Sequence, residues 1–385
     1  SIGLAKDGRP IPITAGARLS GRLGGFTVGG LFAHTKKQGS QPSNLWGVAR
    51  VRRNILKNSD IGAVFMTRAA SGRDNDYNRV FGLDATIRFP GNVDWSIYGL
   101  TSQTPGRTGG QSAFRTSLNR EGNFLHMKGG VMRIDPQFND ELGYLRRTGV
   151  MKSFTDIGIR PRPLSLKKYG VRELHPHAVW NYFNDLDGKF LAKKLHTGFT
   201  VFLDNGGFFE YSENPTADTL DKPFRIHRGD APIPAGFYDW NVHQIKINSD
   251  ASRKLSVNLD LGKGGLWNGR QKSIAPQVRF RPSYRFYVQA GLSRTKVDLD
   301  PLNAHFVQSL LTIRSNYSFN RNMFLDALIQ YDYDQKLRNT NIRFNFIHRP
   351  LSDLYVVYNE QSFDTPEAPA AGRSLVVKFT RMMSF

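Results

Sequence analysis

Residues 253–264 read Arg-Lys-Leu-Ser-Val-Asn-Leu-Asp-Leu-Gly-Lys-Gly, and apolar and polar side chains alternate along this stretch. The apolar positions are Leu255, Val257, Leu259 and Leu261. Successive side chains of a β-strand point to opposite faces of the sheet. The stretch therefore predicts a strand with one apolar face and one polar face.

The same period of two recurs through the chain, for example in 78–89, 188–204 and 336–349. No stretch shows a helical pattern of three turns or more. The alternating runs reach about 10–14 residues, whereas strands of globular proteins cluster near 5–6 residues. A tilted strand that crosses a membrane needs roughly 9–11 residues, so the run lengths favour membrane-crossing strands.

Turn residues separate the strands, and tight turns alternate with looser connections. The tight turns are at 248–252, 281–283, 318–320 and 349–352, and the looser connections are near 265–268, 297–303, 333–336 and 362–373. Two longer loops are expected at 135–149 and 215–236. Short turns at one end and longer loops at the other are typical of outer-membrane barrels.

Composition excludes several other classes of protein. The 385 residues include 53 Lys+Arg against 32 Asp+Glu, a net charge of +21, and no cysteine. There is no apolar run long enough for a transmembrane helix. The absence of cysteine excludes disulfides and cysteine-based metal sites. The positive charge is scattered over all strands without a compact recognition motif, so nucleic-acid binding is not expected.

We therefore predict an all-β fold, a transmembrane antiparallel up-and-down β-barrel of about 22 strands. This count includes residues 1–6 as the stub of a first strand, and it falls to 20 if 112–120 or 206–214 is not a strand. Residues 1–385 would form a single barrel domain that lacks an upstream N-terminal domain.

The last strand carries a further signal. Its apolar phase consists of Leu375, Val377, Phe379, Met383 and Phe385, and the chain ends on Phe385. An alternating final strand that ends in Phe resembles the terminal signal read by the barrel assembly machinery. This resemblance implies a location in the bacterial outer membrane.

Several stretches resemble one family of uncharacterised bacterial outer-membrane β-barrel domains. They are 2–4 with 10–22, 141–148, 232–238, 341–350, 352–360 and 375–380. Members of this family usually carry an N-terminal domain similar to the family-9 carbohydrate-binding module. The resemblance implies the barrel fold and no known activity. Because the carbohydrate-binding-like domain is not in these residues, any link to glycans depends on a segment outside them.

If the apolar face contacts lipid, the opposite face lines the lumen and is net basic. The predicted lumen-lining basic residues are Arg18, Arg22, Arg50, Arg52, Arg88, Arg279, Arg281, Arg314, Arg343 and Lys378. A basic lumen would concentrate anionic solutes or hold an acidic partner. In the alternative interpretation, much of the basic excess lies at strand ends, where it contacts outer-membrane lipid, lipopolysaccharide or solvent.

No catalytic, cofactor or metal site is predicted. His175 and His177 share a strand face but lack a third metal ligand at a useful spacing. The acidic residues Asp298, Asp300, Asp332 and Asp334 fall in two loops and are interpreted as solvated charge. The alternative is calcium binding across the loops, since carboxylates offer oxygen ligands. No acid, base and nucleophile can be grouped from spacing, so an enzyme is not expected.

The predicted function is a pore or transporter conduit with a polar, net-basic lumen, linked through the resemblance to glycan capture or uptake. Barrels of about 22 strands are plugged in known examples. The candidate plugs are the missing N-terminal domain, one of the loops 135–149 and 215–236, or a second protein. The alternative is a structural scaffold that anchors a partner protein in the outer membrane.

Overall fold

The computed structural model describes residues 2–5, 11–227, 232–364 and 372–382 of the chain. It is an all-β fold with 23 strands and two short 3-10 helices, η1 (Leu164–Tyr169) and η2 (Asp300–Leu302). In the described part of the chain, no helix has both the length and the apolar character needed to cross a membrane.

The chain divides into two compact units, which are described separately. Unit 1 comprises Ser1–Ile159 and Ala178–Lys194, and unit 2 comprises Arg160–His177 and Leu195–Phe385. Strands β10 (Val171–Asn184) and β11 (Phe190–Leu203) contribute to both units.

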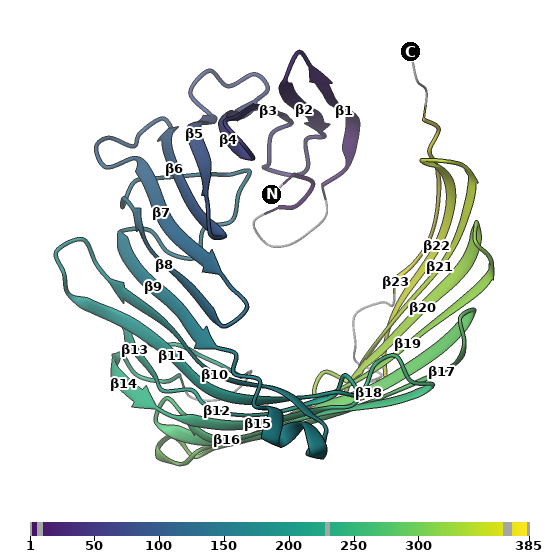
Figure 1. The fold of residues 1–385 in the computed structure, drawn as a ribbon. Helices are drawn as coiled ribbons and strands as arrows, with labels where there is room; N and C mark the ends of the chain where they lie inside the picture. Colours follow the sequence, from purple (N-terminus) through teal and green to yellow (C-terminus); the bar gives the residue numbers. More distant parts are fainter. Residues whose placement is uncertain (1, 6–10, 228–231, 365–371, 383–385) are drawn as a thin grey trace. The chain divides into compact units, whose positions relative to one another are not determined.

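Unit 1 contains nine further strands, which follow one another side by side (Figure 1). They are β1 (Ile13–Leu23), β2 (Phe26–Thr35), β3 (Asn44–Ile55), β4 (Ser59–Ala70), β5 (Tyr77–Phe89), β6 (Val93–Gln103), β7 (Ser112–Glu121), β8 (Leu125–Ile134) and β9 (Val150–Ile159).

Unit 2 contains the remaining twelve strands. They are β12 (Phe208–Glu213), β13 (Thr216–Leu220), β14 (Gly236–Trp240), β15 (Val242–Asn248), β16 (Leu255–Leu266), β17 (Gly269–Ser283), β18 (Phe286–Leu299), β19 (Ala304–Asn320), β20 (Met323–Asp332), β21 (Leu337–Arg349), β22 (Ser352–Phe363) and β23 (Gly372–Phe379).

The topology is a large antiparallel meander, as the period of two predicts. Strands pair with their neighbours in sequence except around the hairpin β13–β14, where β12 pairs with β15 and β11 also pairs with β13. The strand pairings of the described residues define this sheet, and they include no pairing between β1 and β23.

Three local predictions can be compared with the strand boundaries. The two uncertain segments, 112–120 and 206–214, are formed as β7 and β12. Residues 2–5 form a turn and an isolated bridge, so the predicted first strand over 1–6 is wrong for its described part. Residues 216–220 of the predicted loop 215–236 form β13, because they pair with residues 236–240 of β14.

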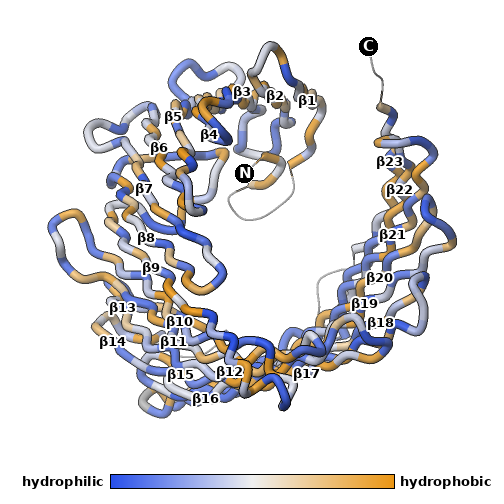
Figure 2. The backbone as a smooth tube through the Cα atoms, viewed as in Figure 1, coloured by the Kyte–Doolittle hydropathy of each residue, from blue (hydrophilic) through white to orange (hydrophobic). Residues whose placement is uncertain are grey.

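The two sheet faces differ strongly in character. In β5, Leu83 is 69% exposed and shares its face with Phe81 and Phe89, whereas Asp84 lies on the other face. Figure 2 shows hydrophobic and hydrophilic residues alternating along the strands. Both clusters of buried apolar residues include residues of the polar face, such as Val80 and Val297. We call the two sides the apolar face and the polar face.

The connections differ between the two ends of the strands. In unit 1 the connections at one end of the strands are short turns, at 24–25, 56–58, 90–92 and 122–124. The connections at the other end are longer, at 36–43, 71–76, 104–111 and 135–149. In unit 2 the corresponding short turns include 204–207, 249–254, 284–285, 321–322 and 350–351. The β13–β14 hairpin and the connections 300–303 and 333–336 lie at the opposite end of unit 2. Two connections depart from this division: the predicted looser connection near 265–268 is a two-residue turn at 267–268, and the connection 160–170 lies at the end with the short turns. We call these ends the short-turn end and the long-loop end.

Candidate functional site

Strand pairing places all the predicted basic residues except Arg281 on the polar face of their unit. Residues that are directly opposite in neighbouring strands share a face, so each side chain can be followed from strand to strand. Unit 1 carries Arg18 and Arg22 on β1, Arg50 and Arg52 on β3, and Arg88 on β5. Unit 2 carries Arg279 on β17, Arg314 on β19, Arg343 on β21 and Lys378 on β23. Arg281 lies at the end of β17, at a register shift, so strand pairing does not assign it to a face. Whether this face lines a lumen stays a prediction.

One arginine of unit 1 forms an ion pair across an intervening strand. The guanidinium of Arg50 on β3 binds the carboxylate of Asp84 on β5 through both terminal nitrogens. It passes over Gly62 of β4, where an added Cβ would lie 2.8 Å from Arg50 Nη2. A side chain at this position would require the end of the Arg50 side chain to move.

Two further predicted arginines also have acidic partners. Arg343 Nη2 donates to Asp326 Oδ2 at 2.8 Å, and Asn316 Nδ2 donates to Asp326 Oδ1 at 2.7 Å. In unit 1, Arg88 Nε lies 3.5 Å from Asp94 Oδ1. These pairs fix the orientation of the side chains and reduce the positive charge that each arginine contributes to the face.

Other predicted basic residues keep their charge uncompensated. Within the described ranges, no ion pair is formed by Arg18, Arg22, Arg52, Arg279, Arg281, Arg314 or Lys378. Arg279 stacks on the ring of Tyr287, with Cζ 4.4 Å from the ring centroid, and Arg281 Nη2 donates to the carbonyl of Ser252. Apart from Arg281, this set adds uncompensated positive charge to the polar face, as do Arg115 of β7 and Lys152 of β9, which the sequence analysis did not single out.

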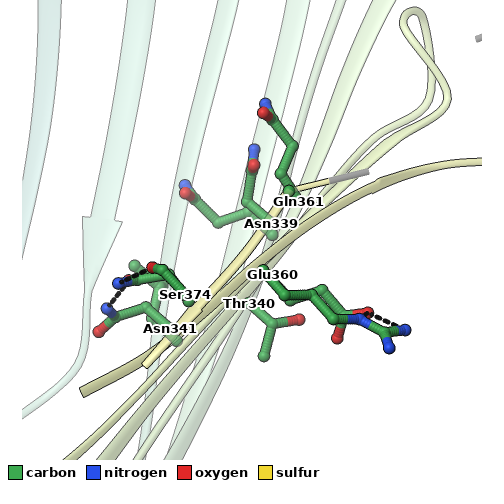
Figure 3. Close-up of a pocket in the computed structure, with 11 residues that line it drawn as sticks. Asn339, Thr340, Asn341, Glu360, Gln361 and Ser374 are labelled. Carbon is green, nitrogen blue, oxygen red and sulfur yellow. Dashed lines mark hydrogen bonds and ion pairs between the residues drawn. The ribbon is translucent and has the colours of Figure 1, made fainter. Parts of the chain in front are cut away.

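The polar face of β20–β23 also carries rows of neutral amides (Figure 3). Gln330, Asn339 and Gln361 lie opposite one another in β20, β21 and β22. In the next row, Asn341 Nδ2 donates to Asn359 Oδ1 at 2.5 Å, and Asn359 Nδ2 donates to Ser374 Oγ at 3.2 Å.

These amide rows lie beside charged residues of the same face. Figure 3 shows Asn339, Asn341, Gln361 and Ser374 on one side of the sheet, with Thr340 and Glu360 on the other. Amide groups both donate and accept hydrogen bonds. The polar face of unit 2 therefore combines uncharged hydrogen-bonding groups with the Arg314 and Arg343 guanidinium groups.

The loop 135–149 docks onto the polar face of unit 1. Its Phe138 is 1% exposed and packs in a cluster with Val80 of β5, Ala113 of β7 and Val150 of β9. Val80 and Ala113 belong to the polar face by their pairing registers. Burial of one aromatic side chain thus holds the loop against the sheet.

Hydrogen bonds and an ion pair fix the same loop. Asn78 of β5 donates to the Asn139 carbonyl at 2.9 Å and accepts from the Glu141 backbone N–H at 3.1 Å. Glu141 also forms an ion pair with Arg68 of β4, whose side chain is only 12% exposed. Asn78 is fully buried and its Nδ2 also donates to Thr104 Oγ1, so the loss of the loop partners would leave its buried amide oxygen unsatisfied.

A second segment docks onto the polar face of unit 2 at its long-loop end. We call the described parts of 221–235 the cover segment. Its Ile233 is fully buried against Val297, Leu299 and Ala304. The ring of His227 stacks on Phe306, with centroids 4.3 Å apart.

The cover segment is also anchored by polar contacts. His227 Nε2 lies 3.1 Å from Asp334 Oδ1, and Phe224 and Ile233 exchange two backbone hydrogen bonds. Val297 and Phe306 are directly opposite each other and lie on the polar face. Each of the two segments predicted as inward-folding loops therefore has residues packed on the polar face of its own unit.

The structure gives the histidine pair a third member that sequence spacing does not reveal. The rings of His175 and His177 stack with centroids 4.5 Å apart. His177 Nε2 lies 3.0 Å from His196 Nε2, and His196 Nδ1 lies 2.8 Å from Asn214 Oδ1. Even so, no group of three or more His, Asp or Glu in the described ranges has the geometry of a metal site.

The acidic loop residues of unit 2 are engaged in local contacts. Asp298 Oδ1 lies 3.2 Å from His305 Nδ1 and 3.3 Å from Lys296 Nζ. Asp300 pairs with Arg270 at 2.5 Å, and Asp332 accepts hydrogen bonds from the backbone of the 333–336 turn. Each of these carboxylates therefore has a protein partner through at least one oxygen.

The predicted C-terminal signal is only partly within the described residues. Leu375, Val377 and Phe379 lie on the apolar face of β23 and are 68%, 62% and 63% exposed. Met383 and Phe385 lie outside the described residues. Tyr98 of β6 lies on the polar face, opposite Asp84, and its hydroxyl contacts Met132 Sδ.

The comparisons with known proteins add no relative from which a role could be transferred. No protein-family model matches this chain, and a search of curated proteins finds no match either. The resemblance to the barrel family thus stays a prediction from the quoted stretches.

Proposed function

We propose that this chain is a transmembrane β-barrel of the bacterial outer membrane whose polar, net-basic interior forms a conduit. The observation that carries the proposal is the exposed apolar face that runs along the strands of both units. Monomeric soluble proteins rarely expose contiguous apolar patches larger than a few hundred Å². Lipid is the environment in which such a face is stable.

The proposal requires the edges of the sheet to be paired. β1 and β23 are exposed along their whole length. An unpaired backbone group in hydrocarbon costs several kcal/mol. We propose that closure of the barrel, directly or through a further strand, supplies the missing hydrogen bonds.

The interior would favour anions. Arg18, Arg22, Arg52, Arg314 and Lys378 lie on the polar face without an acidic partner among the described residues. A passage lined by one sign of charge raises the local concentration of the opposite ion. The amide rows of β20–β23 would add hydrogen bonds for polar solutes, including glycans.

The docked segments would restrict this conduit. Loop 135–149 and the cover segment both occupy the polar face near the long-loop end. In an outer-membrane barrel, the longer loops lie outside the cell. We therefore propose a passage that is narrowed at its extracellular mouth, in a protein that contacts outer-membrane lipid and is assembled by the barrel assembly machinery.

The first test is conductance of the full chain in planar bilayers, with Arg314→Gln as the probe. In water, one unit charge interacts with an ion 4 Å away by about 1 kcal/mol. Removal of the Arg314 charge should therefore lower the anion-to-cation permeability ratio roughly five-fold. Arg321→Gln, the same charge change in an exposed turn, should leave the ratio nearly unchanged.

The other outcomes assign different functions. A chain that inserts into bilayers, does not conduct and purifies with a stoichiometric partner protein would support the scaffold instead. A chain that stays in aqueous solution without detergent would overturn the membrane assignment. Equal permeability ratios in the wild type and Arg314→Gln would show that this arginine does not face the passage.

A further inference from the structure

Three lysines lie in a row across the apolar face of unit 2. Lys263 of β16 is directly opposite Lys272 of β17, which is directly opposite Lys296 of β18. All three are exposed. We call them the lysine row.

This arrangement is unfavourable without a counter-ion. Side chains directly opposite each other in neighbouring strands have Cβ atoms about 4.5–5.5 Å apart, and like charges at this separation destabilise the sheet. Arg294, two residues before Lys296 on the same face, adds a fourth positive charge. The row therefore concentrates positive charge where neutral side chains would pack better.

The acidic residues near the row do not neutralise it. Among the described residues, Lys263, Lys272 and Arg294 form no ion pair. Lys296 lies 3.3 Å from Asp298, which also contacts His305. The other charged groups at this end of the face are already engaged: Asp300 with Arg270, and Glu213 with His243.

The position of the row indicates what could supply the negative charge. On the short-turn side, the next row of the same face contains Leu261, Ile274 and Arg294, and the row after it contains Leu259 and Pro276. The long loops lie on the other side of the row. The lysine row thus marks the border between the exposed apolar face and the long-loop end of unit 2.

We propose that the lysine row binds the phosphate groups of a phosphorylated outer-leaflet glycolipid of the lipopolysaccharide type. The proposal rests on the membrane assignment made above, and it adds a defined lipid site to it. The acyl chains would lie along the apolar rows, and the headgroup phosphates would lie between the ammonium groups.

The spacing of the row favours a headgroup with two phosphates. Neighbouring strands are about 4.7–4.9 Å apart, so Lys263 and Lys296 are separated by roughly 10 Å across the sheet. A diphosphorylated sugar headgroup can contact both ends of such a row. A single phosphodiester can contact only part of it, so ordinary phospholipids should bind more weakly.

The test measures binding of defined lipids to the full chain by native mass spectrometry in mild detergent. The probes are diphosphorylated lipid A, its dephosphorylated form and phosphatidylglycerol. The variant is Lys263→Gln with Lys272→Gln, and the matched control is Lys254→Gln, an exposed lysine at the short-turn end of the same unit. Each basic residue near an anionic lipid surface contributes to the free energy of binding. The loss of two such contributions should weaken lipid A binding roughly 30-fold.

The expected result is a loss of lipid A binding in the double variant and not in Lys254→Gln. Equal binding by the double variant, or equal binding of the dephosphorylated lipid, would overturn the proposal. Phosphatidylglycerol that binds as tightly as lipid A would overturn the assignment to a glycolipid. If the wild type inserts and conducts but these differences are missing, only this inference fails, whereas a wild type that does not enter bilayers refutes the membrane assignment itself.

Discussion

Phe138→Ala should increase the single-channel conductance of the reconstituted protein. Phe138 is the 1% exposed anchor of loop 135–149, and its truncation removes the contacts with Val80 and Val150. Replacement of a buried Phe by Ala typically costs about 3–5 kcal/mol. The ratio of docked to undocked loop should then fall by more than about a hundred-fold. A loop that leaves the polar face would widen the proposed passage.

The matched control is Tyr144→Ala in the same loop. Tyr144 is 84% exposed, so its loss should change neither docking nor conductance. Susceptibility of 135–149 to protease should rise in Phe138→Ala and stay low in Tyr144→Ala. If the loop of Phe138→Ala becomes accessible to protease and the conductance stays at the wild-type value, the loop does not restrict the passage.

Val278→Arg should destabilise the protein in the membrane by about 2–4 kcal/mol, which is the cost of an arginine on the lipid face at the bilayer midplane. Val278 is 43% exposed and lies between Val257 and Ala290 of the neighbouring strands, within the apolar face. The free energy of unfolding from liposomes in urea measures this effect.

Gln277→Arg is the control for this substitution. Gln277 is the preceding residue and points to the polar face, opposite Asn258 and Gly291. The same arginine there should change the free energy of unfolding by much less than in Val278→Arg. Similar losses in the two variants would contradict the assignment of the apolar face to lipid, because both faces would then be in water or both would be packed.

The strands and their faces could be predicted because period-two alternation is a local property. Phe81 and Leu83, or Leu259 and Leu261, identify their own face without knowledge of any partner strand. The short hairpin β13–β14 was missed because five residues such as Thr216–Leu220 are too few to show a period. Its pairing depends on β14, which lies beyond the connection.

The contacts of the polar face could be predicted only in part. The position of Arg50 on that face follows from alternation, but its partner Asp84 lies two strands away and depends on the register. The third histidine, His196, is 19 residues from His177 and becomes its neighbour only when β10 and β11 are both formed. Docking of Phe138 depends equally on contacts between distant segments.

The Arg50–Asp84 pair has a consequence for how the strands find their correct alignment. If a strand slips by two residues relative to its neighbour, every side chain stays on the same face of the sheet. The apolar side chains alone therefore distinguish poorly between registers that differ by two residues. Such a slip of β4 would put Asp60 or Val64 in the place of Gly62, where an added Cβ already lies 2.8 Å from Arg50 Nη2. The observed register therefore places the end of the Arg50 side chain over a residue without a side chain, whereas in either adjacent register a side chain would lie beneath it.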